Sequence, residues 1–175
     1  MMEAIDVIDT AVKVGLGAMI SGVSTYWVTK LNHASDREKD KSKRTHETLI
    51  SITEKIERYL DCMTRCIARV DGIIKHGIPA GTIPDDILNE YRKVDSELVE
   101  ARKERSSAYS RLRLIGEMEA ANCVRELTKF ESKFRNPILF DHQLPSQEEL
   151  IALSVEFTAI REKAFKALNT AYNNA

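Results

Sequence analysis

Apolar residues recur every three or four positions along most of the chain. One row runs from Leu49 to Ile73, a second from Ile87 to Ile115, and a third from Leu150 to Ala171. This spacing places the side chains of a row on one face of a helix, and a regular alternation of threes and fours is typical of coiled-coil packing. The pattern predicts an all-α protein in which residues 45–175 form an antiparallel three- or four-helix bundle.

Turn residues separate the rows. Gly77 and Pro79 follow the first row, Pro84 opens the second, and Ser146 stands three residues before a glutamate, as in a capping box. As one helix, residues 85–134 would rise about 75 Å, whereas residues 45–76 rise only about 48 Å. The longer segment must therefore break, at Ser106-Ser107 or at Gly116, or stay whole and pair with the segment before residue 45.

The loop after this segment carries three consecutive large apolar residues, Ile138, Leu139 and Phe140. If residues 85–134 formed one unbroken antiparallel helix, the loop would lie at the level of residue 30. Our hypothesis for that arrangement is that the loop touches the membrane surface. The alternative is that it covers the end of the bundle.

An uncharged run near the N-terminus predicts a transmembrane helix. Sixteen residues without charge lie between Lys13 and Lys30, and Tyr26 and Trp27 stand just before Lys30. If both lysines extend to the interface, residues 11–31 give about 31 Å of helix, enough to cross a bilayer. Aromatic rings are expected at the headgroup level. The residues predicted to lie in the membrane are Val14, Leu16, Met19, Ile20, Val23, Tyr26, Trp27 and Val28.

Small residues in this segment predict a surface for helix pairing. Ala11, Gly15, Ala18 and Gly22 follow one another at spacings of four, three and four. Small side chains on one face allow two membrane helices to approach closely. We therefore expect a homo-oligomer that associates within the lipid bilayer; the alternative is a lone anchor helix whose glycines are incidental.

Charge on either side of the segment predicts its orientation. Residues 1–13 carry three acids and one base, whereas residues 30–44 carry six bases and three acids. The positive-inside rule then predicts a single-pass protein of the bacterial inner membrane, with its N-terminus outside and its C-terminal part in the cytoplasm. The predicted parts are a membrane anchor helix (1–31), a charged stalk (32–44) and a cytoplasmic bundle (45–175). A buried first helix in a cytoplasmic protein and a helix lying at the interface remain alternatives.

The search for chemistry predicts no catalytic, cofactor-binding or metal site. The cysteines, Cys62, Cys66 and Cys123, suit core positions in a reducing compartment. Glu97, Glu100 and Glu104 have the spacing of the magnesium carboxylates in all-helical nucleotide pyrophosphohydrolases, but the second acidic motif of those enzymes is missing. A solvated helix face is therefore expected.

Basic residues do not favour a nucleic-acid-binding protein. The net charge is −1, from 26 bases and 27 acids. The basic group between residues 102 and 113 lies among glutamates that cancel much of its field. Its members are Arg102, Lys103, Arg105, Arg111 and Arg113, and Arg105 also interrupts the second apolar row.

These observations favour a non-enzymatic, membrane-anchored helical protein that mediates oligomerisation or recruits a protein partner at the cytoplasmic face of the membrane. In composition, the first 45 residues look like those of many small bacterial or phage membrane-anchored proteins. Two alternatives stay open. One is a phage or defence effector that perturbs the membrane after oligomerising through its N-terminal helix, and the other is a soluble helical enzyme or regulator with a buried first helix.

Overall fold

The protein is all-α, as predicted. The computed structural model describes the backbone of residues 2–175 and the side chains of residues 37–175, and the chain divides into two units, residues 1–44 and 45–175. The helices are α1 (Met2–Lys75), α2 (Asp85–Leu114), α3 (Met118–Leu139) and α4 (Gln147–Asn174). Two short strands, β1 (Gly81–Thr82) and β2 (Gln143–Leu144), lie in the loops between helices.

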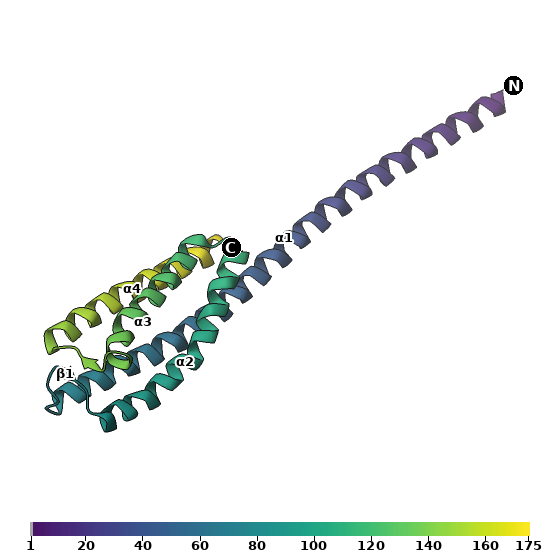
Figure 1. The fold of residues 1–175 in the computed structure, drawn as a ribbon. Coiled ribbons are helices and arrows are strands. Elements are labelled where there is room, and N and C mark those ends of the chain that lie inside the picture. The colour runs from purple at the N-terminus through teal and green to yellow at the C-terminus, as the bar shows by residue number, and fades with distance from the viewer. Residues whose placement is uncertain (1) are drawn as a thin grey trace. The chain divides into compact units, whose positions relative to one another are not determined.

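Residues 45–175 form an antiparallel four-helix bundle (Figure 1). Ion pairs between neighbouring helices run in opposite sequence order, as in Arg58–Glu104 and Arg69–Glu90 between α1 and α2, which is the signature of antiparallel neighbours. The other neighbours in the ring are α2 with α3, α3 with α4, and α4 with α1. Of the two predicted bundles, the four-helix form is the one adopted.

The predicted apolar rows form the core of this bundle. Every position of the first row is buried, namely Leu49, Ile52, Ile56, Tyr59, Met63, Cys66, Val70 and Ile73. Between α3 and α4, the Phe130 ring stacks on Phe157 with 5.3 Å between centroids. Because the alternating threes and fours keep one face turned inward, the pattern of the first row predicted which of its side chains would be buried. In the second and third rows, Ile87, Val94, Ile115, Leu153 and Ile160 are partly buried and pack against the core.

The long second block breaks at Gly116. The Gly116 amide donates to the Arg113 carbonyl at 3.2 Å, and the Glu117 amide donates to the Leu112 carbonyl at 2.9 Å. These two bonds make a Schellman motif, which needs a left-handed residue after the helix, and Gly116 has φ of +88°. The chain then reverses, so α2 and α3 are separate helices that pack against each other.

The two loops at the other end of the bundle pair with each other. Gly81 opposes Leu144 and Thr82 opposes Gln143, and the Ile83 amide donates to the His142 carbonyl at 2.9 Å. The helix break places Ile138 to Phe140 at this end, which is the end far from Thr45. The unbroken helix that would bring this loop to the level of residue 30 is therefore absent. Ile138 is buried and Leu139 packs against the core, while Phe140 is 72% exposed.

The first unit is the N-terminal part of α1. Its described side chains, residues 37–44, are exposed except for the half-buried Ser42. Among the residues that the structure describes, no helix is long and apolar enough to cross a membrane. The predicted span and its small-residue face fall in residues 1–31, whose side chains lie outside the described part of the chain.

Candidate functional site

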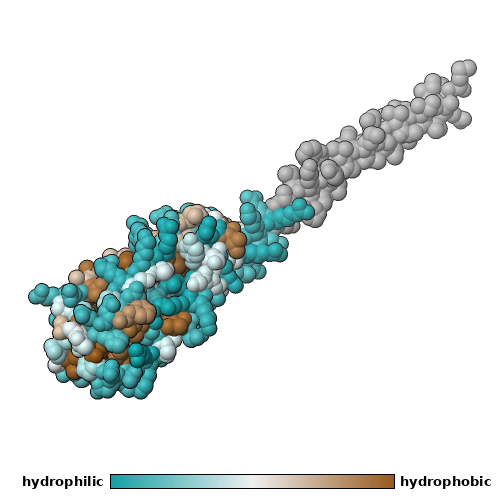
Figure 2. All heavy atoms as spheres, viewed as in Figure 1, coloured by the Kyte–Doolittle hydropathy of each residue, from teal (hydrophilic) through white to brown (hydrophobic). Residues whose placement is uncertain are grey.

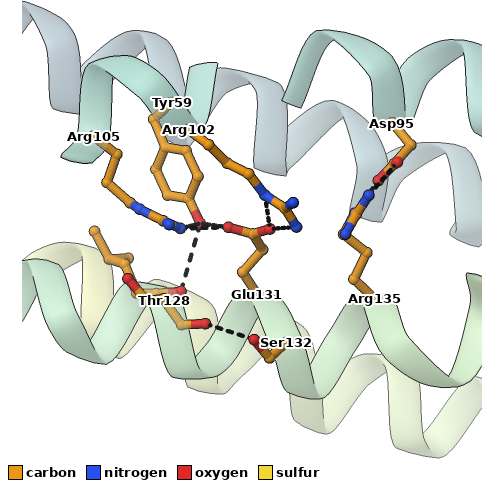
Figure 3. Close-up of polar contacts among 9 residues, drawn as sticks. Tyr59, Asp95, Arg102, Arg105, Thr128, Glu131, Ser132 and Arg135 are labelled. Carbon is orange, nitrogen blue, oxygen red and sulfur yellow. Dashed lines mark hydrogen bonds and ion pairs between the residues drawn. The ribbon is translucent and has the colours of Figure 1, made fainter. Parts of the chain in front are cut away.

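A buried carboxylate, Glu131 on α3, joins three helices. Its Oε2 accepts a hydrogen bond from the Tyr59 hydroxyl of α1 at 3.0 Å. The same oxygen forms an ion pair with Arg105 of α2. Its Oε1 accepts from Arg102 Nε of α2 at 2.5 Å. Figure 3 shows these donors converging on the carboxylate. Only 2% of Glu131 is exposed, so its charge is balanced from within the protein.

Arg105 is held from two sides. Its Nη1 donates to the Tyr59 hydroxyl at 3.1 Å, and its guanidinium carbon lies 4.8 Å from the centre of the Tyr59 ring. Arg105, which interrupts the second apolar row, therefore points into the bundle. There it forms an ion pair with Glu131 and stacks on the Tyr59 ring.

A second buried pair lies one turn along α3. Arg135 makes a two-point contact with Asp95 of α2, in which Nη2 donates to Oδ2 at 2.6 Å and Nε donates to Oδ1 (Figure 3). Planar guanidinium and carboxylate groups match in this geometry, which fixes the relative position of the two helices. The hydrogen bond from Arg135 to Asp95 raises the pKa of the arginine.

Burial also perturbs the neutral groups around these pairs. Burial, and then the negative charge of Asp95, raises the pKa of the Cys66 thiol to about 12. Burial raises the pKa of Tyr91, with Cys66 and Asp95 adding to the effect, and burial followed by Glu131 raises the pKa of Tyr59. The interior between α1, α2 and α3 therefore holds two ion-paired carboxylates, Glu131 and Asp95. The thiol and phenol groups around them stay neutral.

This interior sets the register of the helices. Hydrophobic contacts tolerate sliding, whereas a buried carboxylate with its donors on two other helices has one satisfactory position. Removing one partner would leave a charge buried and unpaired, at a cost of about 3–5 kcal/mol. We interpret the Glu131 and Asp95 pairs as elements that specify one packing of the bundle.

The exposed edges of the bundle carry further ion pairs. Arg58, Arg65 and Arg69 of α1 face α2, where they pair with Glu104, Glu97 and Glu90. Lys133 and Lys163 join α3 and α4 through Glu156 and Glu126. Together with the buried pairs between α2 and α3, ion pairs thus cross three of the four lines where neighbouring helices meet.

The fourth line, between α1 and α4, differs. We call it the α1–α4 seam, and it joins residues 50–71 of α1 to residues 147–172 of α4. Within these described residues no ion pair crosses it, and its one side-chain hydrogen bond, from Gln147 to Asp71, is long at 3.4 Å. Two depressions open along the seam, and Ile151 and Val155 beside one of them are 55% and 65% exposed.

Several residues singled out in the sequence are engaged within the bundle. Arg102 and Arg105 bind Glu131, so their charges are already compensated within the protein. Glu97, Glu100 and Glu104 each pair with a base; Glu97 and Glu100 are exposed, whereas Glu104 is half-buried. All three cysteines are buried and free. No group of acids, histidines and cysteines among the described side chains could hold a metal ion.

The buried pairs and the seam were missed in the sequence. Arg105 gave a signal, because it breaks an apolar row, but Glu131 lies 26 residues away from it and Tyr59 lies 46 residues away. The seam also had a sequence signal, a second row of positions on α4 with spacings of four and three, all of which are exposed in the structure except the half-buried Phe165. Its members are Ile151, Val155, Thr158, Glu162, Phe165, Asn169 and Tyr172.

Comparison with known proteins gives this chain no family. No protein-family description, no curated protein and no solved structure matches it.

Proposed function

We propose that this protein is a membrane-anchored helical scaffold that recruits a protein partner at the cytoplasmic face of the membrane through the α1–α4 seam. The seam carries the proposal. The other three lines of helix contact in the bundle have ion pairs across them, whereas this one presents exposed Ile151 and Val155 beside open depressions. Exposed apolar side chains beside a depression are typical of a surface that another protein covers.

The anchor is proposed from the sequence. Residues 11–31 have the length and the flanking lysines of a span, and the base-rich residues 30–44 follow it. We assign self-association to the small residues between Ala11 and Gly22, because two seams facing each other would bring acidic side chains together.

Fractionation of cells that express the tagged full chain tests the anchor. We expect the protein in the membrane pellet after a carbonate wash, and a variant lacking residues 1–31 in the supernatant. Recovery of the full chain in the supernatant would overturn the anchor.

Photo-crosslinking in the same cells tests recruitment. A photoreactive amino acid replaces Thr158 in the seam or, as the control, the exposed Ser110 on α2. We expect a discrete heavier product from position 158 that position 110 does not give. Identical patterns from both positions would argue against the seam.

A further inference from the structure

We propose that the occupant of the α1–α4 seam is a basic amphipathic helix of a partner protein. This inference rests on the proposed function, since it assigns the partner's chemistry at the surface proposed for recruitment. Three properties of the seam lead to it: its shape, the sign of its charge, and the spacing of its side chains.

The shape is that of a long, shallow groove interrupted once. One depression of about 680 Å³ lies between residues 64–71 of α1 and the first half of α4, with Ile67, Ile151 and Val155 in its lining. Another of about 400 Å³ lies nearer the C-terminus, with Ile50, Phe165 and Tyr172 in its lining. Residues 50–71 of α1 rise about 32 Å, the length of a helix of about six turns. A helix fits this length, and the apolar lining fits one apolar face.

The charge of the groove is negative. Glu54, Glu57, Asp71 and Glu162 line the two depressions, and no lysine or arginine lines either of them. The chain as a whole has 26 bases and 27 acids, so this surface is segregated in charge. The cause lies in α1, whose Arg58, Arg65 and Arg69 all turn to α2, leaving acids on the side of α4.

Bases beside the groove compensate only part of this charge. Lys75 pairs with Asp71 at 2.6 Å, and the Arg161 guanidinium lies 5.9 Å from the centre of the Phe165 ring. Within residues 37–175, no ion pair engages Glu54, Glu57 or Glu162. These three carboxylates are available to lysines or arginines beside the apolar face of a bound helix.

The spacing of the α4 side chains also fits a helix. The row from Ile151 to Tyr172, exposed except for the half-buried Phe165, alternates four and three, the pattern by which the side chains of one helix pack between those of another. Figure 2 shows that, on the face in view, charged and polar side chains cover most of the bundle and apolar ones lie in separate patches between them. In the seam, the apolar members of the row are Ile151 and Val155 in one depression and Phe165 and Tyr172 in the other.

Two occupants from within this protein fit less well. A second copy would set the glutamates of one groove against those of the other, which is unfavourable. The base-rich segment 32–44 has the right charge, but it contains no large apolar side chain to fill the depressions. A partner that offers both an apolar face and flanking bases satisfies both requirements.

The test uses two synthetic probes. The first is a fluorescein-labelled three-heptad helical peptide with leucines on one face and lysines beside them, and the second has glutamates in place of the lysines. Each is titrated against the full chain in a nonionic detergent while anisotropy is recorded, and detergent alone supplies the background. We expect the basic peptide to bind at least about tenfold more tightly than the acidic one, and salt to weaken its binding.

Charge reversal in the groove locates the binding. In Glu57→Lys/Glu162→Lys, which changes one acid in each depression, we expect the basic peptide to bind about tenfold more weakly and the acidic peptide to bind more tightly. The control is Glu100→Lys on the exposed face of α2, which should bind like the wild type. Thermal unfolding confirms that each variant is folded, since all three positions are at the surface.

Two results would overturn the inference: equal binding of both peptides to the wild type, or unchanged binding to the doubly reversed variant. If either occurred while position 158 still gave its own crosslink in membranes, the result would contradict the basic helix as the occupant. It would not contradict recruitment of a partner through the seam. Loss of the crosslink together with retained peptide binding would instead contradict recruitment in the cell.

Discussion

The α1 helix meets its two neighbours in different ways. Toward α2 it presents arginines that pair with glutamates, and behind them lie Tyr59 and the Glu131 carboxylate. Toward α4 it presents glutamates and small or apolar side chains, and no ion pair crosses the seam between residues 50 and 71 of the described structure. One helix therefore supplies a closed side, which fixes the packing of the bundle, and an open side, which leaves room for another molecule.

The largest expected effect comes from the closed side. Glu131→Ala leaves Arg105 buried without its counter-charge, so we expect the free energy of unfolding to fall by about 3–5 kcal/mol. Urea unfolding followed by circular dichroism measures it. The control is Glu126→Ala on the same helix, which removes an exposed pair with Lys163 and should cost less than about 1 kcal/mol. Equal losses in the two variants would show that burial of the network contributes nothing.

Alkaline pH should weaken the same side next. The pKa of Cys66 rises on folding from about 9 to about 12, so its contribution to stability is complete below about pH 9 and is lost as the pH rises toward the folded value. At about pH 10.5 we expect a loss of about 2 kcal/mol from this thiol, and the raised pKa values of Tyr59 and Tyr91 act in the same direction.

Urea midpoints at about pH 7 and about pH 10.5 measure this loss, for the wild type and for Cys66→Ala. The variant has no thiol at this position, so its midpoint should fall less between the two pH values. Parallel falls in both proteins would contradict the assignment to Cys66.

The turn that brings α3 back onto α2 should give a smaller effect. Gly116→Ala places a side chain at φ of +88°, so we expect a loss of about 1 kcal/mol. The matched change is Gly72→Ala inside α1, where an added methyl group meets nothing within 4 Å; it should stabilise by about 0.5–1 kcal/mol. Thermal unfolding compares the two, and a shift of the same sign in both would contradict the role given to the turn.

The open side should give the smallest effect on stability. Val155→Ser changes a side chain that is already 65% exposed, so we expect a change within about 0.5 kcal/mol. Val70→Ala, at a fully buried position of α1, should cost about 1–3 kcal/mol by the same measurement. If Val155→Ser destabilised the protein as much as Val70→Ala, the seam would be part of the core and would not be free to bind.

The sequence predicted the helices well because their signals are local. The row from Leu49 to Ile73, the turn glycine Gly77 and the capping box at Ser146 all have the expected roles, and the Glu149 amide donates to the Ser146 hydroxyl at 3.2 Å. The break at Gly116 was one of two candidates. Serines fit inside a helix and glycine permits a left-handed turn, but only packing of α3 against α2 decides between a turn and a continuous helix.

The buried pairs could not be predicted in this way. Asp95 and Arg135 are 40 residues apart, and each taken alone has the character of an ordinary charged residue on a helix surface. Their burial depends on both arriving at the same place, which is a property of the assembled bundle. The seam has a different origin. It arises because residues 50–71 of α1 and 147–172 of α4 form no ion pair with each other in the described structure.

The strand pairing between the two loops has a mechanical consequence. It ties the connection after α1 to the connection before α4 at one end of the bundle, while Thr45 and the C-terminus lie at the other, where His46 touches Tyr172. A pulling force applied between residue 45 and the C-terminus would therefore separate α1 from α4 along the seam. The contacts would break one after another, starting at the end where His46 touches Tyr172. The tied loops would separate last.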